Sequence, residues 1–401
     1  MAITDKKTGP WGLDQVYNKI NQGSIWEYSG SAAAYAWGRN ESKGALGQNN
    51  KTNYSSPVQI PGTTWTQIRI YDYNSASFGL KSDGTLWAWG NNDDGRMGVN
   101  LGPDHSRSSP IQIPGTNWSR IRGHSYGGMA TKTDGTLWVW GVNTQGTLGQ
   151  NNRTTYSSPR QIPGTWSNNF DMGEYAMLAV NTDGELWGWG GQGERGILGQ
   201  NEGGGWYRYS SPVQIPGTTW SQTAGQLDIN SGSAAAMKTD GTLWCWGRNE
   251  QGRCGPASPG GNEGFSSPVQ VPGTTWSQVA SGNYNTIAVK TDGTLWVWGS
   301  NKFGAHGRNN ANPDNQVFHS PLQIGSDTDW SECDMNVAQI GTKSALKTDG
   351  TLWVWGQTPY GQLGLNTNED SQTYYSSPTQ IPGIWADPIN GNNSCGAAQI
   401  L

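Results

Sequence analysis

The chain has 401 residues, a formal net charge of −5 and an unusual share of glycine (59 residues) and tryptophan (23 residues). A charge this close to zero argues against a disordered chain. It also argues against a general binder of nucleic acid or anionic membranes, which needs a basic surface. No apolar run approaches the roughly 20 residues that span a bilayer. The composition favours an all-β, turn-rich globular protein whose core is built from tryptophan.

The first 28 residues stand apart from the rest of the sequence. Apolar residues within positions 12–21 follow a helical i, i+3, i+4, i+7 spacing, which predicts a short amphipathic helix. No ordinary signal peptide is recognisable in this segment. We expect an extension that packs as a plug on the remaining domain or serves as an attachment segment. The residues expected to make the contact are Trp11, Leu13, Val16, Tyr17, Ile20 and Trp26.

From residue 29 to residue 401 the sequence repeats one pattern seven times. The pattern is Thr-Asp-Gly-Thr-Leu-Trp-x-Trp-Gly with small changes, followed by x-Asn-x-x-Gly-x-Leu-Gly. A variable stretch, Ser-Ser-Pro-x-Gln-Ile-Pro-Gly and a lone Trp complete each unit. The copies are about 53 residues apart on average, measured at the glycine that ends each Trp-x-Trp-Gly. These glycines are Gly38, Gly90, Gly141, Gly190, Gly247, Gly299 and Gly356.

Each unit contains the signals of short strands joined by tight turns. Six units carry an Asp-Gly pair, such as Asp83-Gly84, between two extended runs, and this pair tolerates the positive φ of a tight hairpin. Trp87 and Trp89 are two residues apart, so they lie on the same face of a strand. Seven such units predict an all-β, seven-bladed β-propeller over residues 29–401, with one blade per unit.

The two ends of the repeat region are complementary. The first unit has no Asp-Gly turn, and residues 33–38 supply only the strand that follows such a turn. Residues 391–401 align with residues 282–292 of an earlier unit and stop where that turn would come. We predict that the C-terminal strand pairs with the N-terminal strand and closes the ring within one blade, which leaves no large exposed sheet edge.

The repeat resembles that of the regulator of chromosome condensation (RCC) family. The matching residues are clearest in Gly350–Gly356 and Gly361–Gly364, and the resemblance covers residues 29–401. It implies a seven-bladed propeller. The functions it implies differ among members, from action on a small GTPase and on chromatin to inhibition of β-lactamases by a secreted member. One loop feature of the name-giving member, Gly123-His124-Ser125, occurs in one unit only and without a basic tail, so an exchange-factor role is not expected.

The sequence offers no convergent set of catalytic groups, so we expect no enzyme, no metal and no cofactor. The recurring aspartates belong to the Asp-Gly turns, where they cap the backbone. The four cysteines lack CxxC spacing and are expected to be reduced and mostly buried. The histidines fall in different loops and are expected to be exposed there: His105, His124, His306 and His319.

Abundant tryptophan is also typical of sugar-binding surfaces, but its positions here argue for packing. Twenty of the 23 tryptophans fall at the repeated positions of the pattern, which predicts that they build the blades. The tryptophans that lie off the repeat are Trp11, Trp26 and Trp206.

Residues that differ between units are the candidates for function, because the shared residues build the fold. One variable segment precedes the fourth Ser-Ser-Pro, and its Trp206, Tyr207 and Arg208 have the composition of a binding hot spot. A second variable set follows each lone Trp, and its Tyr and Asn side chains suit recognition by rigid rings and adaptable hydrogen bonds. In this fold class such segments gather on one face around the central channel. The candidate binding residues of this set are Tyr73, His124, Tyr126, Tyr175 and Tyr284.

Two functions are compatible with these observations. Residues 9–26 resemble leader segments of virion and tail-fibre proteins of tailed bacteriophages. The leading prediction is therefore a non-enzymatic virion protein that decorates the head or tail and contacts other virion proteins through residues 1–28 or one propeller face. Such a protein would bind a host-surface protein or glycan, but neither nucleic acid nor the membrane interior. The alternative is a bacterial protein-binding module, such as an inhibitor or an adhesion domain.

Overall fold

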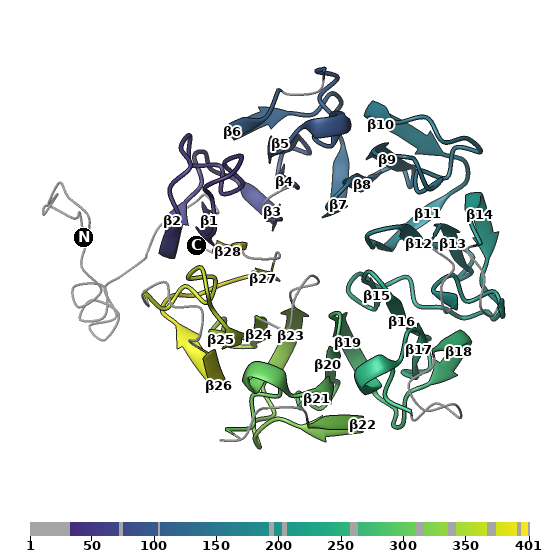
Figure 1. Cartoon of the computed structure of the whole chain (residues 1–401), viewed down its shortest axis with the longest axis vertical. Helices are drawn as coiled ribbons and strands as arrows, with labels where there is room; N and C mark the ends of the chain where they lie inside the picture. The colour runs from purple at the N-terminus through teal and green to yellow at the C-terminus, as the bar shows by residue number, and fades with distance from the viewer. Residues whose placement is uncertain are drawn as a thin grey trace, which may run out of the picture.

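The computed structural model describes residues 33–71, 75–102, 105–191, 196–202, 207–256, 264–309, 316–335, 342–366, 374–390 and 394–399. These residues form seven four-stranded antiparallel sheets, arranged as blades around a central opening (Figure 1). The prediction of an all-β, seven-bladed propeller is confirmed. The helix predicted over residues 12–21 lies outside the described residues. The same holds for the predicted attachment residues Trp11, Leu13, Val16, Tyr17, Ile20 and Trp26.

Every sheet begins at the central opening and ends at the outer rim (Figure 1). The innermost strands are β3 (Trp65–Arg69), β7 (Trp118–His124), β11 (Trp166–Met172), β15 (Leu227–Ile229), β19 (Trp276–Ser281), β23 (Trp330–Met335) and β27 (Asp387–Asn390). The second strands are β4 (Ala76–Lys81), β8 (Gly127–Lys132), β12 (Ala176–Asn181), β16 (Ser233–Met237), β20 (Asn285–Lys290), β24 (Lys343–Lys347) and β28 (Ser394–Gln399).

The third strand of each blade carries the Trp-x-Trp-Gly segment, and the fourth carries the Ser-Pro step. The third strands are β1 (Ala33–Gly38), β5 (Leu86–Gly90), β9 (Leu137–Gly141), β13 (Leu186–Gly190), β17 (Leu243–Gly247), β21 (Leu295–Ser300) and β25 (Leu352–Gln357). The fourth strands are β2 (Tyr54–Gln59), β6 (Arg107–Gln112), β10 (Tyr156–Ile162), β14 (Tyr209–Gln214), β18 (Phe265–Gln270), β22 (Val317–Gln323) and β26 (Tyr374–Ile381). Among the described residues, the loops between these two strands contain the 3-10 helices η1 (Asp93–Gly95), η3 (Glu250–Gly252) and η4 (Lys302–Gly304).

The second tryptophan of each Trp-x-Trp-Gly joins its blade to the preceding one. It is buried, and its indole N–H donates a hydrogen bond to a loop carbonyl of the preceding unit, as from Trp89 to Ala45 at 2.7 Å. The lone Trp65 packs edge-on against it, with ring centroids 6.0 Å apart. Such aromatic pairs contribute about 0.5–1.5 kcal/mol beyond their buried area. The same indole-to-carbonyl bond is made by Trp37, Trp140, Trp189, Trp246, Trp298 and Trp355.

The Asp-Gly turns are held by a short chain of side-chain hydrogen bonds. Asp292 accepts from the backbone N–H of Thr294 at 3.0 Å and from its hydroxyl at 2.6 Å. The Thr294 hydroxyl oxygen in turn accepts from the indole N–H of Trp296 at 2.8 Å. The two hydrogen bonds from threonine lower the pKa of Asp292. The sheet of β11 to β14 departs from this pattern, because Glu185 replaces the threonine and accepts from the side chain of Asn181 at 2.7 Å.

The ring closes within one blade, as the sequence predicts. β1 pairs antiparallel with β28, with Ala33 opposite Gln399 and Gly38 opposite Ser394. The closing sheet therefore has the strand order β2-β1-β28-β27 and contains strands from both ends of the chain. Because β1 and β28 each have a partner on both sides, neither presents a free edge.

Side chains join neighbouring innermost strands around the central opening. Gln67 of β3 donates to the carbonyl of Ser119 and accepts from the N–H of Ile121, both at 3.2 Å, on β7. Further round the ring, Asp228 of β15 accepts from the N–H of Ser281 on β19 at 2.7 Å. These bonds satisfy backbone groups at the inner edges of the blades, which would otherwise need water.

Candidate functional site

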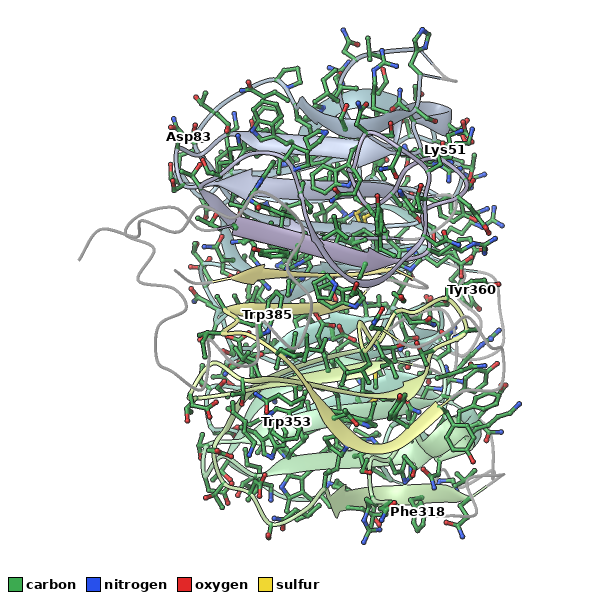
Figure 2. All side chains as sticks on the ribbon, turned by 90° about the vertical axis from the view of Figure 1, so that its left-hand side faces the viewer. Lys51, Asp83, Phe318, Trp353, Tyr360 and Trp385 are labelled. Carbon is green, nitrogen blue, oxygen red and sulfur yellow. The ribbon has the colours of Figure 1, made fainter. Side chains whose placement is uncertain are left out.

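The variable loops gather on one face of the ring, which we call the loop face. It carries the loops between the first and second strands and those between the third and fourth strands of each sheet. The Asp-Gly turns lie on the opposite face, so that Asp83 is on one side of the ring in Figure 2 while Lys51 and Tyr360 are toward the other. The loop face therefore brings together loops of neighbouring blades.

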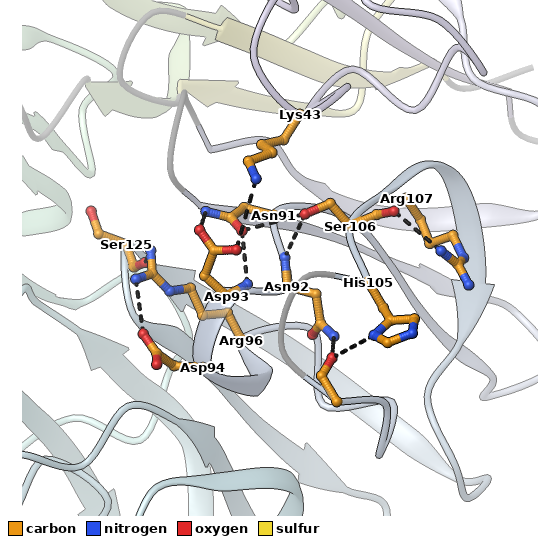
Figure 3. A network of polar contacts seen from close by, with 11 residues as sticks. Lys43, Asn91, Asn92, Asp93, Asp94, Arg96, His105, Ser106, Arg107 and Ser125 are labelled. Carbon is orange, nitrogen blue, oxygen red and sulfur yellow. Dashed lines mark hydrogen bonds and ion pairs between the residues drawn. The ribbon is translucent and has the colours of Figure 1, made fainter.

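Arg96 connects two neighbouring blades on the loop face. It follows η1, and its guanidinium donates to the carbonyl of Ser125, in the loop between β7 and β8, at 2.9 Å (Figure 3). The same guanidinium lies 5.3 Å from the ring centroid of Tyr126 and forms an ion pair with Asp94 at 3.4 Å. Because Arg96 is itself buried, this cation–π contact holds the Tyr126 ring in place.

The loop that carries Arg96 is fixed by its own polar side chains (Figure 3). The Asn91 side chain accepts from the backbone N–H of Asp93 at 2.8 Å and donates to its carboxylate at 3.0 Å. Lys43, from the preceding unit, lies 3.8 Å from the same carboxylate. The side chain of Asn92 accepts from the N–H of Met97 at 3.1 Å. These contacts hold the loop in the conformation that places Arg96 over the next blade.

Tyr126 and Tyr175 form the centre of the candidate site. Their ring centroids are 5.9 Å apart and their planes are tilted by 36°. Tyr175 belongs to the loop between β11 and β12, so three successive blades contribute to the group Arg96, Tyr126, Glu174 and Tyr175, which we call the tyrosine cluster. Burial and a hydrogen bond with Glu174 raise the pKa of Tyr175, so its phenol is protonated at neutral pH. Both rings are partly exposed.

The prediction that the loop histidines are exposed is wrong for His124 and His306. His124 is the last residue of β7 and is only 5% exposed, and His306 is buried as well. Burial lowers the pKa of His124 to about 4, although the carboxylates of Glu174 and Asp171 act in the opposite direction. The imidazole is therefore neutral at pH 7. His124 lies two residues before Tyr126 and supports the tyrosine cluster from the interior of the protein. Its buried side chain is not available for direct contact with a partner.

The contact between arginine and tyrosine occurs a second time on the loop face. Arg253 follows η3 and lies 5.6 Å from the ring centroid of Tyr284, which is 36% exposed. This pair joins two neighbouring blades in the same way as Arg96 and Tyr126. Burial lowers the pKa of Arg253 to about 10, so its guanidinium stays charged at neutral pH.

Both arginines were missed in the sequence analysis, although a signal was present. Arg96 and Arg253 occupy the same place in the Gly-x-Leu-Gly segment of two different units, where the other units have Ala, Thr, Ile or Gln. Glu174 directly precedes Tyr175 in the variable segment that follows a lone Trp. These residues act through neighbours on another blade, and that adjacency is a property of the closed ring.

Tyr207 and Arg208 lie apart from the tyrosine cluster, in the loop before β14. β14 is an outermost strand, and both side chains are exposed, Tyr207 to 43%. The hydroxyl of the following residue, Tyr209, donates to Glu202 at 2.6 Å. Trp206 and Tyr73 lie outside the described residues. The predicted contact residues therefore separate into an inner group on the loop face and a segment at the rim.

The wall of the central channel is divided by charge. Arg69, Arg120 and Arg122 come from β3 and β7, whereas Asp228 and Asp334 come from β15 and β23. They line a cavity with an empty volume of about 890 Å³. Burial raises the pKa of Asp228 well above its usual range, and neighbouring carboxylates raise it further. Together with the hydrogen bond that Asp228 accepts from Ser281, this favours a structural role for the carboxyl group.

Within the described ranges, no group of three or more His, Cys, Asp or Glu side chains could hold a metal ion. In the same part of the chain, no helix is long and apolar enough to cross a membrane. Cys245, Cys254 and Cys333 are buried and form no disulfide bond.

Comparison with known proteins tests the relationship that the repeat pattern suggests. Family profiles described as "Regulator of chromosome condensation (RCC1) repeat" match residues 83–131, 134–171, 240–289, 276–305 and 349–396. The RCC1 domain-containing mitochondrial protein RUG3 of Arabidopsis thaliana is 30% identical over 379 residues, which cover 84% of this chain and 80% of RUG3. The chain belongs to the RCC1 repeat family.

Other RCC1-repeat proteins share the propeller at lower identity. The human E3 ubiquitin-protein ligase HERC2 is 25% identical over 394 residues, which cover 93% of this chain but 8% of HERC2. Prp20p of Saccharomyces cerevisiae, whose structure is described together with its binding to Gsp1p and histones, superposes with a TM-score of 0.76 at 17% identity. This match covers 95% of the chain and 94% of Prp20p, and it shows the fold alone.

These relatives support one of the two predicted functions better than the other. Membership of the RCC1 repeat family agrees better with the alternative prediction, a protein-binding module, than with the virion role. They provide no support for the virion role or for the resemblance to phage tail-fibre proteins.

Proposed function

We propose that this RCC1-repeat protein is a non-enzymatic module that binds a partner protein through its loop face. The tyrosine cluster is the observation that carries the proposal. Tyr126 and Tyr175 stand side by side, partly exposed, and Arg96 lies over Tyr126. Tyrosine and arginine are the residue types that dominate binding hot spots, together with tryptophan.

The cluster is suited to binding because its rings are fixed before a partner arrives. Arg96 holds Tyr126 from the preceding blade, and the two ring faces lie against each other. Side chains that are already ordered lose little conformational entropy on binding. Tyr284, with Arg253, offers a second anchor on the same face but on a different blade. Anchors on separate blades suit a partner protein that covers a broad surface better than a small ligand held in one pocket.

Affinity capture with the full chain as bait tests this proposal. The double variant Tyr126→Ala and Tyr175→Ala removes the anchor. The double variant Thr63→Ala and Thr218→Ala, at exposed positions on the opposite face, serves as the matched control. Each chain is immobilised, exposed to a lysate of cells that naturally produce it, and the bound proteins are quantified by mass spectrometry.

We expect a protein that the wild-type and control chains retain and that the tyrosine variant retains at least tenfold less. This corresponds to a loss of about 1.4 kcal/mol of binding free energy. Equal retention by all three chains, at equal thermal stability, would rule out the tyrosine cluster as the contact centre.

Presence in a virus particle is a narrower form of the same proposal. It depends on the resemblance of residues 9–26 to phage proteins, and those residues lie outside the described ranges. Mass spectrometry of purified particles tests it independently of the loop face. Absence of the chain from the particles would exclude a virion role and would leave the binding module intact.

A further inference from the structure

Two positions of the repeat pack against each other in the cores of the blades. One is the residue between the two tryptophans of Trp-x-Trp, and the other is the leucine of Gly-x-Leu-Gly. In the third unit these residues are Val139 and Leu148, which belong to one buried cluster. In the fourth unit, a Cβ atom placed on Gly188 would lie 3.5 Å from Cδ2 of Leu198. Further equivalent pairs that share a cluster are Ala36 with Leu46, Ala88 with Met97, and Val354 with Leu363.

The fifth unit has a cysteine at both of these positions. Cys245 lies between the two tryptophans in β17, and Cys254 follows η3 in the place of the leucine. Both side chains are at most 1% exposed and belong to the core between this blade and the next. The thiol of Cys245 forms a hydrogen bond with that of Cys254, which donates in turn to the carbonyl of Arg248 at 3.5 Å. These two thiols are therefore in direct contact, whereas Cys333 belongs to a different cluster.

Two thiols in contact can be joined by a disulfide bond if one of them moves. The S–S bond is about 2.05 Å long, which is shorter than any hydrogen bond between two sulfur atoms. Cys245 is held in place, because β17 pairs with β16 at Ala235 and with β18 at Val269. Cys254 lies in a loop, where its N–H donates to the side chain of Asn249 at 2.9 Å and not to a strand. The movement therefore falls to Cys254 and its loop.

Cys254 directly follows the residue that joins this blade to the next one. The backbone carbonyl of Arg253 accepts from the indole N–H of Trp298 and from the hydroxyl of Thr286, both at 2.8 Å. The guanidinium of the same arginine lies over the ring of Tyr284. A covalent bond between Cys254 and β17 would therefore fasten the loop that makes all three contacts.

We propose that Cys245 and Cys254 form a redox-active pair, which a peroxide oxidises to a disulfide bond that stabilises the joint between these two blades. The sulfur of Cys254 attacks one oxygen of hydrogen peroxide, the O–O bond breaks, and the thiol proton leaves with the departing hydroxide as water. The sulfur of Cys245 then attacks the sulfur of the resulting sulfenic acid, and its proton leaves with the sulfenic hydroxyl as a second water. Two thiols and one peroxide thus give one disulfide and two waters.

Burial determines how fast this pair reacts. Burial raises the pKa of the Cys245 thiol well above its usual range, and the attacking species is the thiolate. We therefore expect the folded chain to be oxidised more slowly than an exposed thiol, at the rate at which the loop opens. The same burial protects the finished disulfide from reductants. The pair is suited to lasting stabilisation of the joint, whether or not the loop face binds a partner.

Peptide mapping of the full chain tests the proposal. The folded chain is incubated overnight with hydrogen peroxide, its remaining thiols are alkylated, and it is digested with trypsin without reduction. Trypsin cleaves after Arg248 and after Arg253, so the two cysteines fall in separate peptides, residues 239–248 and 254–290. We expect mass spectrometry to find these two peptides linked, and to find them separated after reduction with dithiothreitol.

Matched variants connect the bond to stability. Cys245→Val and Cys254→Leu each restore the residue of the third unit, so both are expected to fold. Oxidation should raise the melting temperature of the wild type by about 3 °C relative to these variants treated in the same way, because the bond restricts the unfolded chain. Cys333→Ala removes the thiol in the other cluster and should gain as much as the wild type.

Three results would overturn the proposal. The first is that the two peptides of the oxidised, folded wild-type chain remain unlinked. The second is that Cys254 is converted to sulfinic or sulfonic acid in place of the disulfide. The third is that Cys245→Val or Cys254→Leu gains the same thermal stability on oxidation as the wild type.

Discussion

Lys343 places an amine inside a blade at a position where other blades have uncharged side chains. It lies in β24 opposite Trp355, as Ser77 lies opposite Trp89 and Thr286 opposite its own tryptophan. The side chain is 1% exposed, and burial lowers the pKa of its amine from 10.5 to about 7. Between these two pH values the unfolded chain holds the proton and the folded chain does not, so the stability of the wild type rises with pH.

Lys343→Met is therefore expected to raise the free energy of unfolding at pH 7, by on the order of 2–4 kcal/mol. Most of this gain should vanish at pH 10, where the unfolded chain has also lost much of the charge. Urea unfolding at the two pH values measures the difference. A gain of equal size at both would show that the amine is not the cause.

His306 gives the ring a pH dependence in the acidic range. Burial lowers its pKa from 6.5 to about 4, so between these values only the unfolded chain binds the proton. Stability therefore falls as the pH drops below about 6.5. The corresponding residue in four other units is a leucine, as at Leu46 and Leu148. His306→Leu should add about 2 kcal/mol at pH 5 and change stability by less than about 1 kcal/mol at pH 8. Chemical denaturation at both pH values tests this, and a variant that is as acid-sensitive as the wild type would contradict it.

The Asp-Gly turn is the element in which the repeat pattern has the clearest physical cause. Asp292 accepts hydrogen bonds from Thr294, and the Thr294 hydroxyl accepts one from Trp296. Three residues of the repeat pattern therefore form one hydrogen-bonded unit. Asp292→Ala is expected to destabilise the protein by about 1 kcal/mol, because it removes an acceptor that two donors share. The matched control is Asp183→Ala in the one turn where Glu185 stands in place of the threonine. Asp183→Ala should lower the melting temperature less than Asp292→Ala does. An equal decrease would mean that the threonine contacts contribute nothing to stability.

For single strands and turns, the sequence predicted the structure wherever the contacts lie within one repeat unit. Spacing predicted the strands around Trp87 and Trp89 and the turn at Asp83, because these contacts join residues close together in the chain. The burial of His124 and the placement of Arg96 over Tyr126 depend on the neighbouring blade. The residue pattern within one unit contains no information about the blade that packs against it.

Closure is the feature of the whole molecule that its stability depends on most directly. β28 pairs with β1 on one side and with β27 on the other. Deleting residues 394–401 would leave both partners with unpaired edges and would open the ring. We expect this truncation to abolish the cooperative thermal transition, whereas removal of residues 400 and 401 alone keeps every paired residue of β28 and should not. Circular dichroism melting distinguishes the two, and a cooperative melt of the longer truncation would refute the dependence.

The fold of the whole ring was predictable because seven copies of one unit leave few arrangements that bury their tryptophans. The candidate site was predictable only in part. Tyr126, Tyr175 and Tyr284 were found as residues that differ between units, but the arginines that hold them were not. The reason is physical: variability identifies residues freed from packing, whereas Arg96 and Arg253 are buried and take part in packing as well.

The indole-to-carbonyl bonds between blades have a consequence for how the chain can be cut. Each runs from one unit to the unit before it, and the bond from Trp37 to Gln362, which spans the two chain ends, is of the same kind as the other six. These bonds between blades therefore do not mark any blade as the first. A circularly permuted chain, with the original ends linked and new ends opened in another loop on the face of the Asp-Gly turns, would contain the same seven joints. The packing between the blades therefore does not depend on where in the ring the chain ends lie.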